Sequence, residues 1–103
     1  MDEQFFSDRL AALRMRKNVS AREMSLAIGQ NPSYINRIEN RLTLPSMQVF
    51  FYICEYLGVT PAEFFDVENT APEQRRELHH AVDGLNETQT ALMLNLIQSQ
   101  KHE

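Results

Sequence analysis

One cysteine and three glycines are all that this 103-residue sequence contains of those two residue types. A single cysteine, Cys54, cannot form an internal disulfide. No apolar run approaches the roughly 18 residues of a membrane-spanning helix. The acidic N-terminal segment 1–9 also lacks the basic and then apolar order of a signal peptide. We therefore expect a soluble, cytoplasmic protein that makes no contact with membranes.

Patterns that indicate catalysis or metal binding are equally scarce. No nucleophile–base pair, glycine-rich phosphate loop or pair of catalytic carboxylates stands out. His79 and His80 are adjacent, so on a helix they would point about 100° apart, and no further ligands occur at a suitable spacing. Cys54 fits a small buried apolar residue better than a reactive thiol. We expect no enzyme, no cofactor and no metal site.

Apolar residues make up 43% of the chain, which is enough for one packed core. No stretch alternates apolar and polar residues for long enough to predict a strand, so the fold class is expected to be all-α. Apolar spacing and capping signals predict helices over 5–17, from Ser20 to the Gly29 stop, from Asn31-Pro32 onward, over 45–57, 60–65 and 72–82, and from Asn86 onward.

Composition divides the chain at Asp66. Residues 1–66 are expected to form the main domain, and residues 67–103 a helical extension that begins with a linker over 67–72. The last helix carries an apolar stripe that suits either the core of the domain or a dimer interface, and we favour dimerisation. A second candidate interface lies on the helix over 45–57. These two sets are Leu92, Met93, Leu96 and Ile97, and Phe51, Tyr52 and Tyr56.

The net charge of −4 conceals an uneven distribution. Segment 67–103 carries three basic and six acidic residues, whereas segment 9–41 carries seven basic residues against two acidic ones. Phosphates respond to charge within about 8 to 10 Å, so the local balance matters more than the total. We therefore expect modest, salt-sensitive attraction to DNA from Arg9, Arg14, Arg16, Lys17, Arg22, Arg37 and Arg41.

Segment 20–41 predicts two short helices joined by a tight turn at Gly29. In the second helix, Ile35 and Ile38 form a buried pair. Residues three or four apart share a helix face, so polar side chains line the opposite side. This layout is typical of a helix-turn-helix, whose second helix enters the DNA major groove. The outer side carries Ser33, Asn36, Arg37 and Asn40, with Pro32 at the tip and Tyr34 at the flank.

The outer residues fall into two groups by their chemistry. Arg37 can bond a guanine bidentately, and Asn36 can do the same to an adenine. Ser33 suits either a base edge or a phosphate. Phosphate contacts are expected from Arg22, Asn31, Tyr34, Asn40 and Arg41.

Residues 10–66 resemble the Cro/cI-type (XRE) helix-turn-helix family, which has the five-helix lambda-repressor-like DNA-binding fold. The matching pieces occur in order at the family spacing. They are 10–14 (LAALR), 19–23 (VSARE), 28–29 (IG), 33–40 (SYINRIEN), 45–46 (PS) and 57–65 (LGVTPAEFF).

The resemblance implies a homodimer on a pseudo-palindromic operator, with half-sites about 34 Å apart. It also implies a structural ion pair between Arg14 and Glu39. Two positions depart from the family, which often has glutamine where this chain has Ala21 and Pro32. Pro32 cannot hydrogen-bond a base, but it can contact a thymine methyl group. Base readout is therefore expected from Pro32, Ser33, Asn36 and Arg37.

These observations predict a regulator of transcription, a repressor that binds double-stranded DNA as a homodimer. One alternative is the antitoxin of a toxin–antitoxin pair, which would bind a protein partner through the C-terminal helices. Another is a protein-interaction module that has lost DNA binding.

Overall fold

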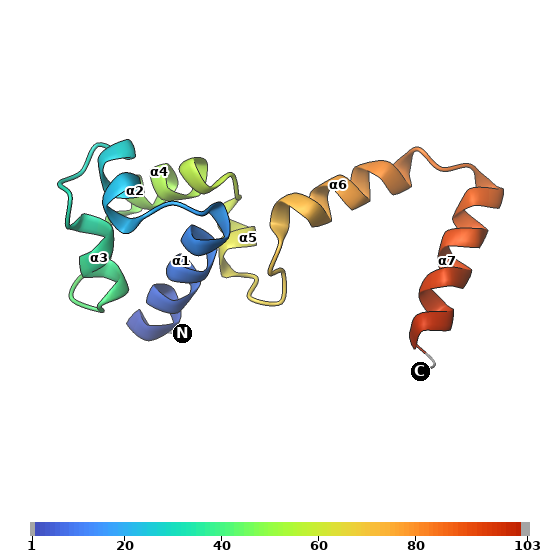
Figure 1. The fold of residues 1–103 in the computed structure, drawn as a ribbon, viewed down its shortest axis with the longest axis horizontal. Coiled ribbons are helices and arrows are strands. Elements are labelled where there is room, and N and C mark those ends of the chain that lie inside the picture. Colours follow the sequence, from blue (N-terminus) through green and yellow to red (C-terminus); the bar gives the residue numbers. More distant parts are fainter. Residues whose placement is uncertain (1, 102–103) are drawn as a thin grey trace. The chain divides into compact units, whose positions relative to one another are not determined.

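The computed structural model describes residues 2–101, which form seven helices and no strand (Figure 1). The chain divides into two compact units, one ending at Pro72 and the other beginning at Glu73. The expected all-α class is confirmed. The helices are α1 (Glu3–Lys17), α2 (Ala21–Ala27), α3 (Tyr34–Glu39), α4 (Met47–Leu57), α5 (Pro61–Phe65), α6 (Pro72–Asp83) and α7 (Glu87–Lys101).

Side-chain caps set where several helices begin. Ser20, Ser46 and Thr60 each accept a hydrogen bond from the backbone N–H three residues later, and Thr60 forms a reciprocal capping box with Glu63. α1 begins earlier than the apolar pattern predicts, because the Asp2 carboxylate caps it by accepting the Phe5 N–H at 3.0 Å.

Left-handed residues mark where helices end. Asn18, Gly29 and Gly58 have φ angles of 62°, 77° and 71°, a conformation that most side chains disfavour. The sequence predicted each of these stops. They produce the sharp changes of direction that let five short helices surround one core.

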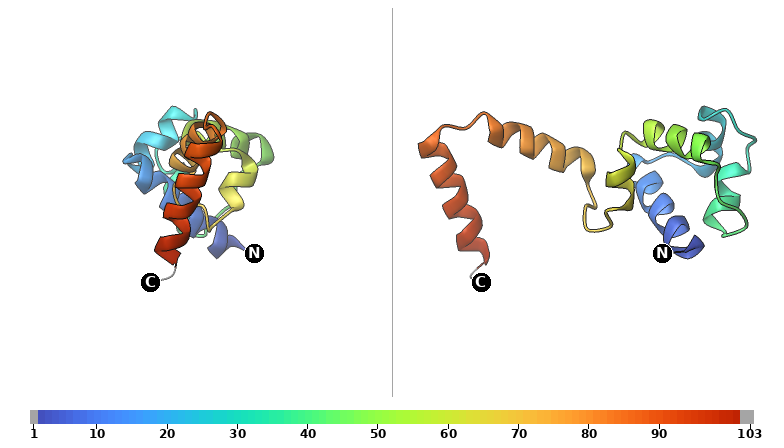
Figure 2. Two further views of the ribbon diagram at one scale, coloured as in Figure 1. Left: turned by 90° about the vertical axis from the view of Figure 1, so that its right-hand side faces the viewer. Right: turned by 180° about the vertical axis from the view of Figure 1, so that it is seen from behind.

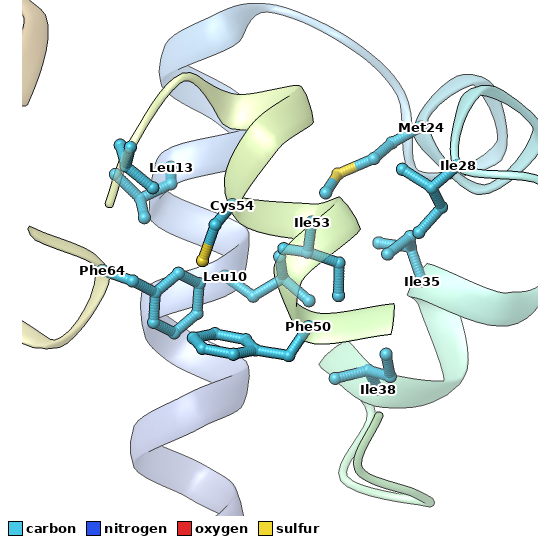
Figure 3. Close-up of a cluster of buried hydrophobic side chains, with 11 residues drawn as sticks. Leu10, Leu13, Met24, Ile28, Ile35, Ile38, Phe50, Ile53, Cys54 and Phe64 are labelled. Carbon is cyan, nitrogen blue, oxygen red and sulfur yellow. The ribbon is translucent and has the colours of Figure 1, made fainter. Parts of the chain in front are cut away.

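The core of the first unit brings together apolar side chains from α1 to α5 (Figure 3). α2 and α3 pack against each other, and α3 also contacts α1, as Figure 1 and the right-hand view of Figure 2 show. Cys54 is 3% exposed, as its place on the inner side of α4 predicted. The buried apolar residues are Leu10, Leu13, Met24, Ile28, Ile35, Ile38, Phe50, Ile53, Cys54, Val59 and Phe64.

The segment over 67–72, which composition predicts to be a linker, packs against the first unit instead. Asn69 and Pro72 are both buried. The Asn69 N–H donates to the Asp66 carbonyl at 3.0 Å, and the buried Arg9 side chain contacts the same segment. The packed unit therefore continues to Pro72, the first residue of α6.

The second unit buries almost nothing within the chain. From Glu73 to Gln100, every side chain is exposed except that of Leu85, which is half-buried. α7 begins with the predicted cap, since Asn86 and Gln89 exchange side chain–backbone hydrogen bonds of 2.9 and 3.1 Å. The apolar side chains left exposed are Leu78, Val82, Leu92, Met93, Leu94, Leu96 and Ile97.

Candidate nucleic-acid interface

A tight turn joins α2 to α3. The Gly29 and Gln30 N–H groups bond back to the carbonyls of Leu26 and Ser25, at 3.1 and 2.9 Å. Gly29 takes the left-handed conformation at this point. The backbone thereby reverses away from α2 and presents residues 31–33 ahead of α3.

α3 begins at Tyr34 rather than at the predicted Asn31-Pro32. The Asn31 side chain forms a local turn instead of a helix cap, because its Oδ1 accepts from both the backbone N–H and the hydroxyl of Ser33, at 3.1 and 2.9 Å. Pro32 thus lies in the turn and is exposed. The six-residue helix Tyr34–Glu39 follows.

The inner side of α3 is wholly buried. Ile35 and Ile38 are both 0% exposed and point into the core (Figure 3). The Ser25 hydroxyl, also fully buried, accepts the Ile35 N–H at 2.9 Å and donates to the Ala21 carbonyl at 2.7 Å. This hydroxyl joins α2 to the first turn of α3, whose backbone N–H groups have no partner within the helix.

Two further contacts hold the end of α3 against α1. The Ser7 hydroxyl is buried and lies 2.7 Å from the Ile38 carbonyl. The Arg14 guanidinium bonds both carboxylate oxygens of Glu39, at 2.7 and 3.0 Å. That hydrogen bond raises the pKa of Arg14, while partial burial opposes the shift. Polar contacts at both ends and two isoleucines between them therefore fix how α3 is presented.

The outer side of α3 carries exposed polar groups. Ser33, Asn36 and Arg37 are exposed, as is Asn40 at the end of the helix. The Asn40 amide donates to the backbone carbonyl and the side-chain oxygen of Asn36, at 2.8 and 3.1 Å. This contact orients the Asn36 amide while leaving its NH₂ group on the surface.

The other residues expected at phosphates have different surroundings. Arg22 is exposed near the start of α2. Tyr34 is half-buried against the core, and this burial raises the pKa of its phenol. Arg41, which has a φ of 63°, lies 3.5 Å from the Asp8 carboxylate in a solvent-exposed pair.

The basic surface is smaller than the charge count of segment 9–41 suggests. Arg9 is only 5% exposed and faces the α5 side of the domain. The expectation that Arg9 helps to attract DNA is therefore wrong. Arg14 is engaged by Glu39. The Lys17 ammonium lies 4.8 Å from the centre of the Tyr56 ring. The positive charge left beside α3 comes mainly from Arg22, Arg37 and Arg41.

The Arg14–Glu39 pair implied by the resemblance is present. The sequence did not reveal the contacts of Ser7 and Ser25 with α3, or those of Arg9 beside α5. Ser7 lies three residues before the buried Leu10, and Arg9 lies four residues before the buried Leu13. Both therefore share the inner side of α1, and this spacing was a usable signal. Ser25 was expected to be small, but its two hydrogen bonds depend on the tertiary packing of α2 against α3.

Within residues 2–101, no three histidine, cysteine, aspartate or glutamate side chains gather where they could hold a metal ion. No helix in the same range is both long and apolar enough to cross a membrane.

Comparison with known proteins gives a family match. A family model described as helix-turn-helix matches residues 10–64, which span α2, the turn at Gly29 and α3. The comparisons with curated proteins and with solved structures found no match. The matched segment covers more than half of the chain and lies within the five-helix unit just described. The chain therefore belongs to the XRE-type helix-turn-helix family of DNA-binding transcription regulators, with a lambda-repressor-like domain.

Proposed function

We propose that this protein is a cytoplasmic repressor that binds a pseudo-palindromic operator as a homodimer and occludes promoter DNA. One observation supports this most strongly. Ile35 and Ile38 are fully buried while Ser33, Asn36 and Arg37 are exposed on the same short helix. A helix that reads the major groove needs this division between an anchored inner side and an accessible polar outer side.

In the proposed complex, Pro32, Ser33, Asn36 and Arg37 contact base edges. The long, planar guanidinium of Arg37 suits a guanine, and the Asn36 amide suits an adenine. The contact from Asn40 supports the second assignment, because it limits rotation of the Asn36 side chain before DNA arrives. Pro32 offers only an apolar surface, which suits a thymine methyl group.

Arg22, Asn31, Tyr34, Asn40 and Arg41 are proposed to contact phosphates. They surround α3 and fix its register without reading sequence. Asp8 competes for Arg41 at 3.5 Å, and both side chains are at least half exposed. An exposed pair of this kind is weak, so Arg41 can exchange it for a phosphate at little cost.

The second unit is proposed to supply the dimer interface. α7 has 15 residues and α6 has 12, lengths at which isolated helices are marginal in water. Their apolar side chains are exposed within the chain, and Leu92 is 65% exposed. Covering them with a second copy would stabilise both helices and bring two DNA-reading units together.

Selection of bound fragments from a random DNA pool tests the proposal and yields the operator. We expect a two-fold symmetric site and binding that weakens steeply as salt rises. The Arg37→Ala variant should lose about 1 to 3 kcal/mol of the free energy of binding to the operator, and its preference at one base pair should relax. Arg75→Ala, an exposed change in α6, is the matched control and should keep the preference. Equal weakening of Arg37→Ala on all sequences would instead make Arg37 a phosphate contact.

A protein partner other than a second copy is the competing explanation for the exposed apolar residues of α6 and α7. Co-purification of an unrelated small protein in a defined complex would favour an antitoxin. Absence of salt-dependent DNA binding at low ionic strength would refute the repressor and favour an interaction module.

A further inference from the structure

Arg9 makes the most extensive set of polar contacts of any buried side chain described in the chain. Its Nε donates to the Phe64 carbonyl, and its Nη2 lies 2.7, 2.9 and 3.1 Å from the carbonyls of Glu63, Asp66 and Asn69. Burial lowers the pKa of this guanidinium, and the Asp66 carboxylate opposes that effect. One side chain of α1 thus bridges the end of α5 to the segment that follows it.

The bridged segment would otherwise be a tether between the two units. It carries the composition of a linker over 67–72, yet Asn69 and Pro72 are buried and Asn69 closes a turn on Asp66. Planar guanidinium groups donate in several fixed directions at once, which a lysine ammonium on a flexible stem does not reproduce. Because Arg9 holds this segment, the chain leaves the packed first unit at Pro72 and not at Asp66.

The length of this tether decides how far apart two DNA-binding units of a dimer can reach. Released and extended, residues 67–72 would span roughly 20 Å in each subunit. Two released tethers would add about 40 Å, more than the roughly 34 Å that separates half-sites one helical turn apart. Releasing both tethers would therefore extend the reach of a dimer by more than one turn of DNA.

We propose that Arg9 is a positioning residue that sets the half-site spacing of the operator by holding the segment 66–72 against the DNA-binding unit. The inference rests on the proposed homodimer. Arg9 touches neither DNA nor the dimer partner in this account. It acts through the length of chain that is free to move, which also sets the effective concentration of the second unit at the second half-site.

Three variants separate the anchor from its other effects. Arg9→Met removes the guanidinium, and Arg9→Lys keeps the positive charge without the branched set of donors. The third variant inserts Gly-Ser-Gly-Ser-Gly-Ser between Thr70 and Ala71, beyond the last carbonyl that Arg9 contacts, and its six residues add about 20 Å of chain, as much as a released segment 67–72. It lengthens the tether while leaving every Arg9 contact in place, so it decides the question even if the Arg9 variants fail to fold.

Each protein is titrated against three DNA duplexes: the selected operator, the same operator with one added helical turn of about 10 base pairs, and a single half-site. We expect the wild type to bind the lengthened operator no more tightly than the half-site. All three variants should bind the lengthened operator about tenfold more tightly than they bind the half-site. Their affinity for the half-site should match that of the wild type within about twofold. A merely structural role for Arg9 would not move this spacing dependence.

The outcomes that overturn the inference are distinct from those that overturn the proposed function. A dimeric, DNA-binding wild type that accepts the lengthened operator would refute the positioning role alone. Folded variants that remain as intolerant as the wild type would do the same. A wild type that sediments as a monomer, or that binds no DNA, would refute the proposed function and the positioning role with it.

Discussion

The buried Ser25 hydroxyl accepts the backbone N–H of Ile35 at 2.9 Å. Replacing it with alanine leaves the buried Ile35 N–H without its acceptor, which should cost about 1 to 3 kcal/mol in the free energy of unfolding. Urea denaturation measures this. Ser33→Ala is the control, because Ser33 is exposed and its loss should cost less than about 0.5 kcal/mol. Equal effects of the two changes would contradict the role given to Ser25.

Burial raises the pKa of the Cys54 thiol to about 11, from an ordinary value of 9.0. The unfolded chain therefore releases this proton at lower pH than the folded chain does, so folding is favoured below pH 9 and loses that advantage as pH rises towards 11. Over this interval the free energy of unfolding should fall by up to about 3 kcal/mol more in the wild type than in Cys54→Ala. Parallel curves for the two proteins would show that Cys54 ionises freely in the fold.

From residue types and spacing, individual contacts were predictable only where they are local in sequence; the Arg14–Glu39 pair, 25 positions apart, followed from the family resemblance instead. The caps at Ser20 and Thr60 follow from residues three apart, and their hydrogen bonds are present. The contacts of Arg9 join residues more than fifty positions apart, so charge counting placed Arg9 near DNA when tertiary packing buries it. The same limit hid the hydrogen bonds of Ser7 and Ser25.

Among the elements, α3 depends most on its neighbours, because six residues are too few to form a stable helix alone. The Arg14–Glu39 pair that anchors it is largely shielded, with side chains 17% and 13% exposed, whereas Arg41–Asp8 is 50% and 65% exposed. Double-mutant cycles built from Arg14→Met with Glu39→Gln, and from Arg41→Met with Asp8→Asn, compare the two pairs.

We expect a coupling of about 1 to 3 kcal/mol for the shielded pair and less than about 0.5 kcal/mol for the exposed pair. The free energy of unfolding of each variant, from chemical denaturation, supplies both values. Similar couplings would mean that solvent screens Arg14 and Glu39 as fully as it screens the exposed pair.

Helix existence and order followed from the sequence, but the starting residues of α1 and α3 did not. Asn31 and Pro32 have the residue types of a helix start, and a local turn closed by Asn31 and Ser33 competes with that start. The segment over 67–72 has the composition of a linker, and the side chain of a buried arginine holds it. In both places the deciding contact is a side chain that composition and periodicity do not register.

Across the whole chain, the two units should be separable. A fragment of residues 1–72 should fold, remain monomeric and bind a two-site operator at least about tenfold more weakly than the full chain. A fragment of residues 1–66 should be less stable than 1–72 by about 1 to 3 kcal/mol, because it removes the Asn69 carbonyl from Arg9 and the buried Pro72.

Sedimentation and chemical denaturation measure these properties of the fragments. Full dimerisation of 1–72 would exclude the second unit as the interface and direct attention to Phe51 and Tyr52, which are 51% and 42% exposed on α4. Equal stability of the two fragments would show that segment 67–72 contributes nothing to the packed unit.

The most direct test of DNA recognition by α3 is the amide NMR spectrum of the full chain, recorded while the selected operator is added. Recognition by α3 predicts that the largest shifts fall on residues 31–41 and on Arg22, with the buried Ile35 and Ile38 remaining protected from solvent exchange. Shifts concentrated in α7, with residues 31–41 unchanged at saturating operator, would contradict it.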